Sequence, residues 1–224
     1  MTLAQILWAG VGSLLFQFLN KERNKETAIF SANIFFLFLL QPITALRGIN
    51  IILPGCTVLL ILAIAFAVCE EISRKDIIQV IAFSFLGFLP FLLAEFIPPL
   101  KNTWLDKNIN QTLLLTFVLI SAALMLFFYS LRKKKKILSF FIILILTIFI
   151  ILKQPQITVL ASKGWRTIFK QNTTLASESD IRWLGFSYIA FRLIHVIREY
   201  QKQRLQNVKV IRLMNFCLFF PSLT

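Results

Sequence analysis

The stretch from Ile51 to Val68 reads IILPGCTVLLILAIAFAV and contains no charged residue. A helix needs roughly 20 apolar residues to cross about 30 Å of hydrocarbon, so this stretch has about the length of a membrane span. Its apolar residues run continuously instead of alternating, and a lipid environment requires the backbone polar groups to be satisfied within the segment. The stretch is therefore predicted to be a transmembrane helix.

Similar apolar runs, separated by short charged clusters, occupy most of the remaining chain. They are Leu3–Leu19, Ala28–Leu46, Ile77–Leu100, Thr112–Leu131, Ile137–Leu152, Ile181 to about Glu199, and a last run that begins near Val210. The first run is expected to be a retained span and not a signal peptide, because no basic residue precedes it and no small-residue cleavage site follows. We expect an all-α, polytopic protein with about seven or eight transmembrane helices and a single transmembrane domain, residues 1–224.

The composition excludes an ordinary soluble domain. Hydrophobic residues make up 58% of the chain and the mean hydropathy is +0.77, against roughly 45–50% apolar residues in soluble domains. The three cysteines, Cys56, Cys69 and Cys217, have neither metal-ligand spacing nor the even number of a disulfide framework. A single histidine argues against a multi-histidine metal site, and we expect no metal.

The net charge of +14 is interpreted as a topology signal and not as a nucleic-acid footprint, because the basic residues flank the apolar runs. The connections after the first, third, fifth and seventh runs hold roughly twice as many Lys and Arg residues as the N-terminus and the other connections together. The positive-inside rule then places the N-terminus outside and the basic cluster Arg132–Lys136 in the cytoplasm, within a plasma (inner) membrane. That cluster could be a topology anchor or an anionic-lipid site.

Two further features are candidates for function. Glu95 lies near the end of its run, before Pro98 and Pro99, and a carboxylate within a membrane is a functional candidate unless it reaches the interface. The segment from about 157 to 170 is amphipathic: Ile157, Leu160, Ala161, Gly164, Trp165 and Ile168 share one side, and Lys163, Arg166 and Lys170 the other. Such a helix is expected to lie flat in the membrane interface, with its tryptophan side toward the acyl chains and its cations among the headgroups. It would serve as an interfacial anchor, or as a lid or docking surface for an acyl donor or acceptor.

The seventh run carries the richest polar pattern. Tyr188, Arg192, His195 and Glu199 are spaced at i, i+4, i+7 and i+11 and fall on one helical stripe, with Ser187 and Asp180 on a neighbouring flank. Charged groups facing lipid are costly, so the stripe is expected to face the bundle interior or line a wet cavity or tunnel. Alternatively, these side chains only satisfy one another, His195 with Glu199 and Arg192 with Tyr188 or a carbonyl.

The sequence WLGFSYIAFRLIH at 183–195, followed by NFCLFFPSLT at 215–224, resembles the membrane-bound O-acyltransferases (MBOAT), in particular the bacterial branch that acylates cell-wall polymers and exopolysaccharides. The resemblance covers Trp183 to Thr224. It implies transfer of an acyl group from a thioester donor, an acyl-CoA or an acyl carrier, to a hydroxyl of a saccharide, polymer or lipid, with a histidine as general base and no other cofactor. His195 does not match the family's catalytic histidine, so no catalytic residue is assigned in this chain.

The last run, from Val210, is short for a crossing, and the chain stops at Thr224, where the family continues with Ala-Gly-Pro-Ile and, further on, its catalytic histidine. We therefore expect the N-terminal part of a longer enzyme, inactive alone. Its expected partners are the lipid bilayer and an acyl carrier or a downstream polypeptide that completes the enzyme; nucleic acid is not one. Two other classes stay open: a transporter or permease whose path includes the stripe and Glu95, and a non-catalytic membrane assembly subunit.

Overall fold

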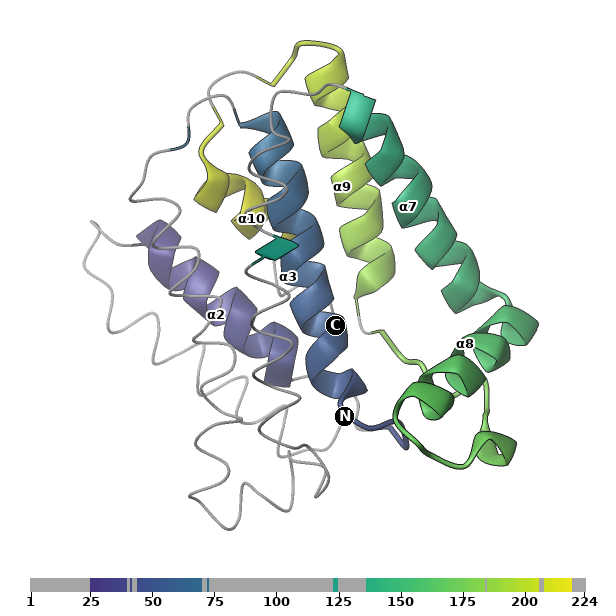
Figure 1. Ribbon diagram of the computed structural model, residues 1–224. Coiled ribbons are helices and arrows are strands. Elements are labelled where there is room, and N and C mark those ends of the chain that lie inside the picture. Colours follow the sequence, from purple (N-terminus) through teal and green to yellow (C-terminus); the bar gives the residue numbers. More distant parts are fainter. Residues whose placement is uncertain are drawn as a thin grey trace.

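The computed structural model describes residues 25–39, 41, 44–69, 72, 123–124, 136–183, 185–205 and 208–218. The regular structure in these ranges is helical, without strands, which confirms the all-helical prediction for this part of the chain (Figure 1). The elements are α2 (Lys25–Leu39), α3 (Ile49–Val68), α7 (Lys136–Lys153), α8 (Pro155–Ile168), the short 3-10 helix η2 (Thr173–Leu175), α9 (Phe186–Gln201) and α10 (Val210–Leu218). Two predicted spans, Leu3–Leu19 and Ile77–Leu100, lie outside the described residues, as does Glu95, and Thr112–Leu131 is described only at residues 123–124.

One described helix, α3, is by itself long and apolar enough to cross a membrane. A second candidate arises if α7 and α8, which meet at an angle of 97°, are counted together as one broken span. The apolar part of α2, Ile29–Phe38, is shorter than a crossing, and α10 has only 9 residues. The described helices therefore provide one or two candidate spans, and the expected number of seven or eight is not confirmed.

Helix α3 forms the centre of the described core, with α2, α7, α9 and α10 packed around it (Figure 1). Its side chains Ile61, Ile64 and Ala65 are fully buried and join one apolar cluster with residues from all four neighbours. Because α3 is apolar on every side, it can serve as the hub against which less apolar helices pack.

Polar contacts fix α10 against α2. Asn215 Nδ2 donates to the carbonyl of Glu26 at 2.7 Å, and Asn33 Nδ2 donates to Asn215 Oδ1 at 3.3 Å. Arg212 Nε also lies 2.7 Å from Glu26 Oε1. The two helices therefore meet in a defined register, set by hydrogen bonds in addition to apolar packing.

The helix boundaries correct two of the predicted ranges. The run predicted over Ala28–Leu46 is a helix that ends at Leu39, and Pro42, which restricts the residue before it and lacks an N–H, explains why the apolar run outlasts the helix. The helix predicted from Ile181 begins at Phe186, after Gly185 in the left-handed conformation with φ of 70°. That conformation suits glycine, which has no Cβ to clash. Asp180 therefore lies in the preceding loop and not on the helix flank.

The break between α7 and α8 has a local cause. Pro155 carries no N–H and disfavours a helical conformation at Gln154, whose φ and ψ are −96° and 109°. The carbonyl of Ile151 accepts a hydrogen bond from Thr158 Oγ1 at 2.6 Å, in place of the backbone bond that a proline cannot donate. The chain thus turns by 97° without leaving that carbonyl unpaired.

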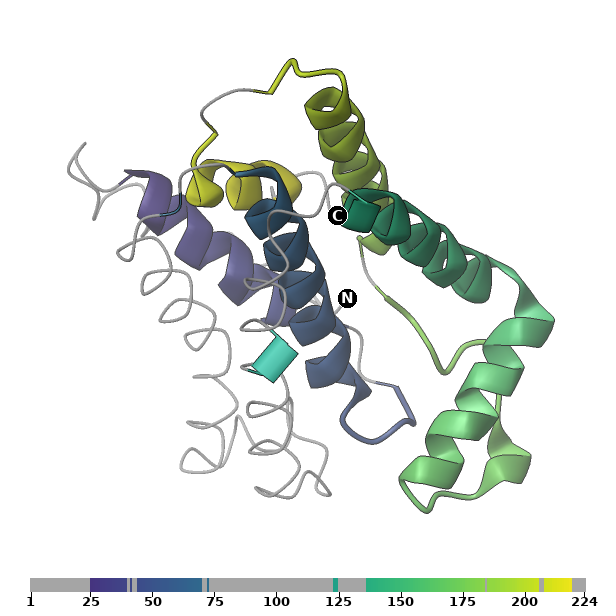
Figure 2. The ribbon, with the colours of Figure 1, turned by 45° about the horizontal axis from the view of Figure 1, so that its top comes forward.

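The helix ends group into two sets at opposite ends of the bundle (Figures 1 and 2). The end of α3, the start of α7 and the end of α9 lie together, whereas α8, η2 and the start of α3 lie at the other end. The loop that holds Arg47 contacts α8 there, since Trp165 Nε1 donates to the Arg47 carbonyl at 3.1 Å. The loop that holds Arg47 and the connection that contains α8 are both expected on the outer side of the membrane. The orientation itself stays a prediction.

Candidate functional site

The rotation of α9 is set by its apolar face. Phe186, Ile189, Leu193 and Ile197 are each no more than 1% exposed, within the cluster that α9 shares with α3 and α7. The predicted polar stripe lies away from this face: Tyr188 is 59% exposed, His195 is exposed, and Ser187, Arg192 and Glu199 are half-buried. The stripe therefore does not enter the apolar core.

Arg192 contacts α10 through two interactions with one residue. Its Nη1 donates to the carbonyl of Phe216 at 2.7 Å, and its guanidinium carbon lies 5.3 Å from the centre of the Phe216 ring. The carbonyl contact agrees with one of the two alternatives for Arg192, namely that it satisfies a backbone acceptor. Because the bond is charge-assisted, it ties the middle of α9 to the end of α10.

Glu199 pairs with basic residues that follow it in the chain. Its carboxylate lies 3.9 Å from Lys202 Nζ and 3.8 Å from Arg204 Nη1, so its ion-pair partners in the described residues are these two and not His195. Lys202 and Arg204 are more than half exposed, and exposed pairs of this kind contribute little stability. The carboxylate and both cations remain accessible to a ligand.

An open groove runs between α9 and α10, with a volume of about 320 Å³. Two members of the predicted stripe, His195 and Glu199, lie on its wall. The full lining consists of His195, Val196, Glu199, Arg204, Leu205, Val208, Arg212, Leu213 and Phe216. Tyr188, Arg192 and Ser187 do not line it, although Arg192 holds the Phe216 ring that does.

The groove combines an apolar surface with cations. Val196 and Leu213 are buried beneath it and Phe216 is 47% exposed, whereas the side chains of Arg204 and Arg212 are 68% and 63% exposed. An apolar chain could lie along the first group while a phosphate or carboxylate contacts the guanidinium groups. The arrangement therefore suits an anionic amphiphile.

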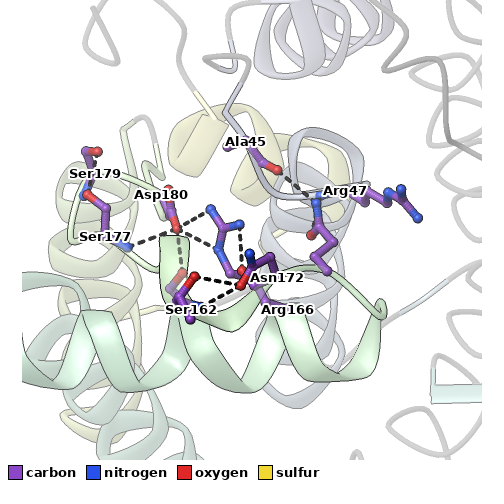
Figure 3. Close-up of polar contacts among 10 residues, drawn as sticks. Ala45, Arg47, Ser162, Arg166, Asn172, Ser177, Ser179 and Asp180 are labelled. Atoms are coloured by element: carbon purple, nitrogen blue, oxygen red, sulfur yellow. Dashed lines mark hydrogen bonds and ion pairs between the residues drawn. The ribbon is translucent and has the colours of Figure 1, made fainter.

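A second polar cluster lies beneath α8 (Figure 3). A single oxygen of Asp180, Oδ2, accepts hydrogen bonds from Ser162 Oγ at 2.6 Å and from Arg166 Nη2 and Nε at 2.8 and 3.1 Å. The backbone N–H of Ser177 also donates to it at 3.1 Å, and Arg166 Nη1 donates to the Asn172 carbonyl at 3.3 Å. The Arg166 and Asp180 side chains are 4% and 7% exposed, so this is a closed ion pair.

Electrostatics favour the ionised form of Asp180. Burial by itself raises the pKa of this carboxyl, but hydrogen bonds from Ser162, Arg166 and the Ser177 N–H, together with the positive charge of Arg166, outweigh it and lower the pKa below the ordinary value. The cluster is saturated by its own members. Its role is to hold α8, not to bind a ligand.

Helix α8 confirms the predicted amphipathic segment and corrects which side chains face the protein. Arg166, expected among the headgroups with Lys163 and Lys170, is buried on Asp180, because a carboxylate from the following loop supplies its partner. Trp165 is half-buried near the start of α3 and stacks on Phe169, with ring centres 5.1 Å apart. Helical periodicity separated cations from apolar residues, but it could not distinguish the one paired cation from the two exposed ones.

Comparisons with protein-family models, with curated proteins and with solved structures found no match. Within the described ranges, no group of three or more His, Cys, Asp or Glu side chains gathers in a way that could hold a metal ion. Any functional assignment for this chain consequently rests on its own residues and on the geometry of the groove.

Proposed function

We propose that this chain is a polytopic membrane protein of about seven or eight spans that binds the acyl donor of an MBOAT-like O-acyltransferase in the groove between α9 and α10. In the complete reaction, the acyl group of a thioester donor passes to a hydroxyl of a saccharide, polymer or lipid. The observation that carries the proposal is an apolar groove surface bordered by two exposed arginines, Arg204 and Arg212, whose exposed ion pairs with Glu199 and Glu26 a phosphate would replace.

An acyl thioester donor has two chemically different parts, and the groove has a surface for each. The acyl chain is apolar and would lie along Phe216, Leu213 and Val196. The phosphate groups of a CoA or of a carrier's phosphopantetheine arm are anionic and would contact Arg204 and Arg212. One guanidinium group can donate two parallel hydrogen bonds to the oxygens of a phosphate. Arg192 supports the site by holding the end of α10 against α9.

The proposal gives His195 a place in the groove wall and no catalytic role. General-base catalysis requires a base within hydrogen-bond reach of the hydroxyl that it activates, and the resemblance assigns that task to a histidine that does not match His195. The contribution of the described helices is to bind and orient the donor, which lowers the entropic part of the barrier to acyl transfer.

Photo-crosslinking of the purified full chain with a diazirine-bearing palmitoyl-CoA tests this assignment. We expect labelling on α9 and α10, competition by unlabelled palmitoyl-CoA, and a loss of about tenfold in apparent affinity in Arg204→Gln, because a charge-assisted contact contributes about 1.5 kcal/mol. Arg198→Gln is the matched control, since Arg198 is exposed near the end of α9 but does not line the groove. Labelling that resists competition, or an equal loss in both variants, would contradict the proposal.

A transporter is the second candidate, and the break between α7 and α8 favours it. Discontinuous helices form binding sites in many secondary transporters, where they usually come in symmetry-related pairs. Within the described residues, the α7–α8 pair is the one bent pair found. Solute uptake by proteoliposomes that depends on this chain, without donor binding in the groove, would favour the transporter.

A further inference from the structure

Helix α8 has a buried polar face and an exposed apolar face, with exposed lysines beside the latter. Thr158, Ser162 and Arg166 are buried against the protein. Leu160, Gly164 and Ile168 form an apolar stripe on the opposite side, where Leu160 is 65% and Ile168 75% exposed. Lys163 lies beside this stripe on the helix, and Lys170 follows just after the helix ends; both are exposed.

The buried face fixes how the apolar stripe and the lysines are presented. The ion pair of Arg166 with Asp180 prevents α8 from rolling about its axis, and the hydrogen bond from Trp165 to the Arg47 carbonyl holds it against the start of α3. Gln171 adds a third tie, because its Nε2 donates to the Ala45 carbonyl at 3.0 Å. These buried contacts therefore orient α8 so that its apolar stripe and its lysines face outward.

The direction of α8 suits a membrane surface. It meets α7 at 97°, so where α7 crosses a bilayer, α8 lies nearly parallel to the bilayer plane (Figure 2). Where α3 crosses a bilayer, the place of α8 at one end of the bundle brings it near the headgroups. In that position the apolar stripe can enter the edge of the acyl region while the lysines reach phosphate oxygens.

We propose that the outer face of α8, made by Leu160, Gly164, Ile168 and Lys163, binds anionic phospholipid headgroups together with Lys170, which follows the helix. Among the described residues neither lysine belongs to an ion pair, so both charges are available for lipid phosphates. A lipid leaflet is favoured over a protein partner, because a leaflet matches an apolar stripe bordered by cations on a helix lying in its plane. The inference holds whether or not the groove between α9 and α10 binds an acyl donor.

Lipid retention by the purified full chain tests the headgroup preference. The protein is incubated in detergent with equal amounts of phosphatidylglycerol and phosphatidylcholine, and the bound lipids are counted by native mass spectrometry. We expect preferential retention of phosphatidylglycerol, reduced about fivefold by each of Lys163→Gln and Lys170→Asn, since a basic residue at an anionic surface contributes about 1 kcal/mol. Asparagine is chosen at 170 because that residue has a φ of 51°, which asparagine tolerates.

Lys202→Gln is the matched control, because Lys202 is 54% exposed and lies at the opposite end of the bundle. Retention that is equal for the two lipids, or lowered equally by the control and by the α8 variants, would overturn the proposal. Gly164 offers a second variant that leaves both lysines in place, since a Cβ added there meets nothing within 4 Å. Gly164→Glu should lower phosphatidylglycerol retention relative to Gly164→Gln, and equal retention by these two variants would also overturn it.

A spin label in place of Ile168 tests the depth of the apolar stripe in the same protein. In proteoliposomes of phosphatidylcholine and phosphatidylglycerol, the label should be more accessible to oxygen than to a water-soluble nickel complex. A label that is more accessible to nickel would place the stripe in water and would contradict the proposal.

Discussion

Asp180 is the residue on which the position of α8 depends most. Its Oδ2 accepts four hydrogen bonds, and its partner Arg166 is equally buried. Removing one member of a buried ion pair costs about 3–5 kcal/mol, because the other charge stays buried without compensation. Asp180→Ala should therefore release α8 from the protein.

Limited trypsin digestion measures that release, because trypsin cleaves after Lys163 and Arg166 on α8 and after Lys170, which follows the helix. Cleavage there should be at least a hundredfold faster in Asp180→Ala, in line with a local opening made about 3 kcal/mol easier. Glu178→Gln is the control, since Glu178 is exposed in the same loop. Unchanged cleavage in Asp180→Ala would show that the ion pair does not hold α8. The double substitution Arg166→Met with Asp180→Leu should restore much of the protection, because it leaves no buried charge.

The docking of α8 should weaken only in strong acid. The pKa of Asp180 is lower in the folded protein than in the unfolded chain, so the carboxylate stabilises the fold fully above the ordinary aspartate pKa of about 3.9. That stabilisation is lost as the pH falls from there through the lowered pKa. Trypsin cannot be used at such pH, so pepsin cleavage within 154–183 between pH 2 and 5 is the measurement, and Asp180→Asn should remove the contribution of this group.

At the level of secondary structure, the turn between α7 and α8 depends on Thr158 as well as on Pro155. Thr158 Oγ1 donates to the Ile151 carbonyl, which the proline leaves without its usual donor. Thr158→Val should destabilise the α7–α8 junction by about 1 kcal/mol, because it leaves that part-buried carbonyl without its donor. Thr158→Ser keeps the hydroxyl and should cost much less. Equal unfolding midpoints for the two variants would contradict this explanation.

The helices that could be predicted from sequence are those whose apolar pattern is uniform. The charge-free run Ile51–Val68 predicted α3 to within two residues, and the periodicity of 157–170 predicted an amphipathic helix that the structure places at Pro155–Ile168. The polar contacts were harder to predict, because they depend on loops. Asp180 reaches Arg166 only because the chain turns back after η2, and no repeat in the sequence indicates that turn.

The candidate site was predicted in part for the same reason. The stripe on α9 groups His195 and Glu199, and both lie on the groove wall. Arg204 and Arg212 were seen only as topology charges, because their position beside that stripe depends on how the connection 202–209 turns α10 against α9. A sequence pattern predicts which residues share one face of a helix, but it does not predict which other helix packs against that face.

At the scale of the whole molecule, the two proposed binding surfaces are expected to face opposite sides of the membrane. The groove with Arg204 and Arg212 lies toward the end of the bundle where α9 finishes, and α8 with Lys163 and Lys170 lies at the other (Figures 1 and 2). If α3 crosses a bilayer, these ends face opposite sides of the membrane, with the proposed donor on one side and the lipid-binding helix on the other.

Cysteine labelling in intact cells tests that separation most directly. Glu178→Cys and Gln201→Cys, each in a chain with Cys56, Cys69 and Cys217 replaced by alanine, are exposed positions at the two ends. A membrane-impermeant maleimide should label position 178 from outside and position 201 only after the cells are opened. Labelling of both positions from the same side, or recovery of the labelled chain in the soluble fraction, would contradict the account.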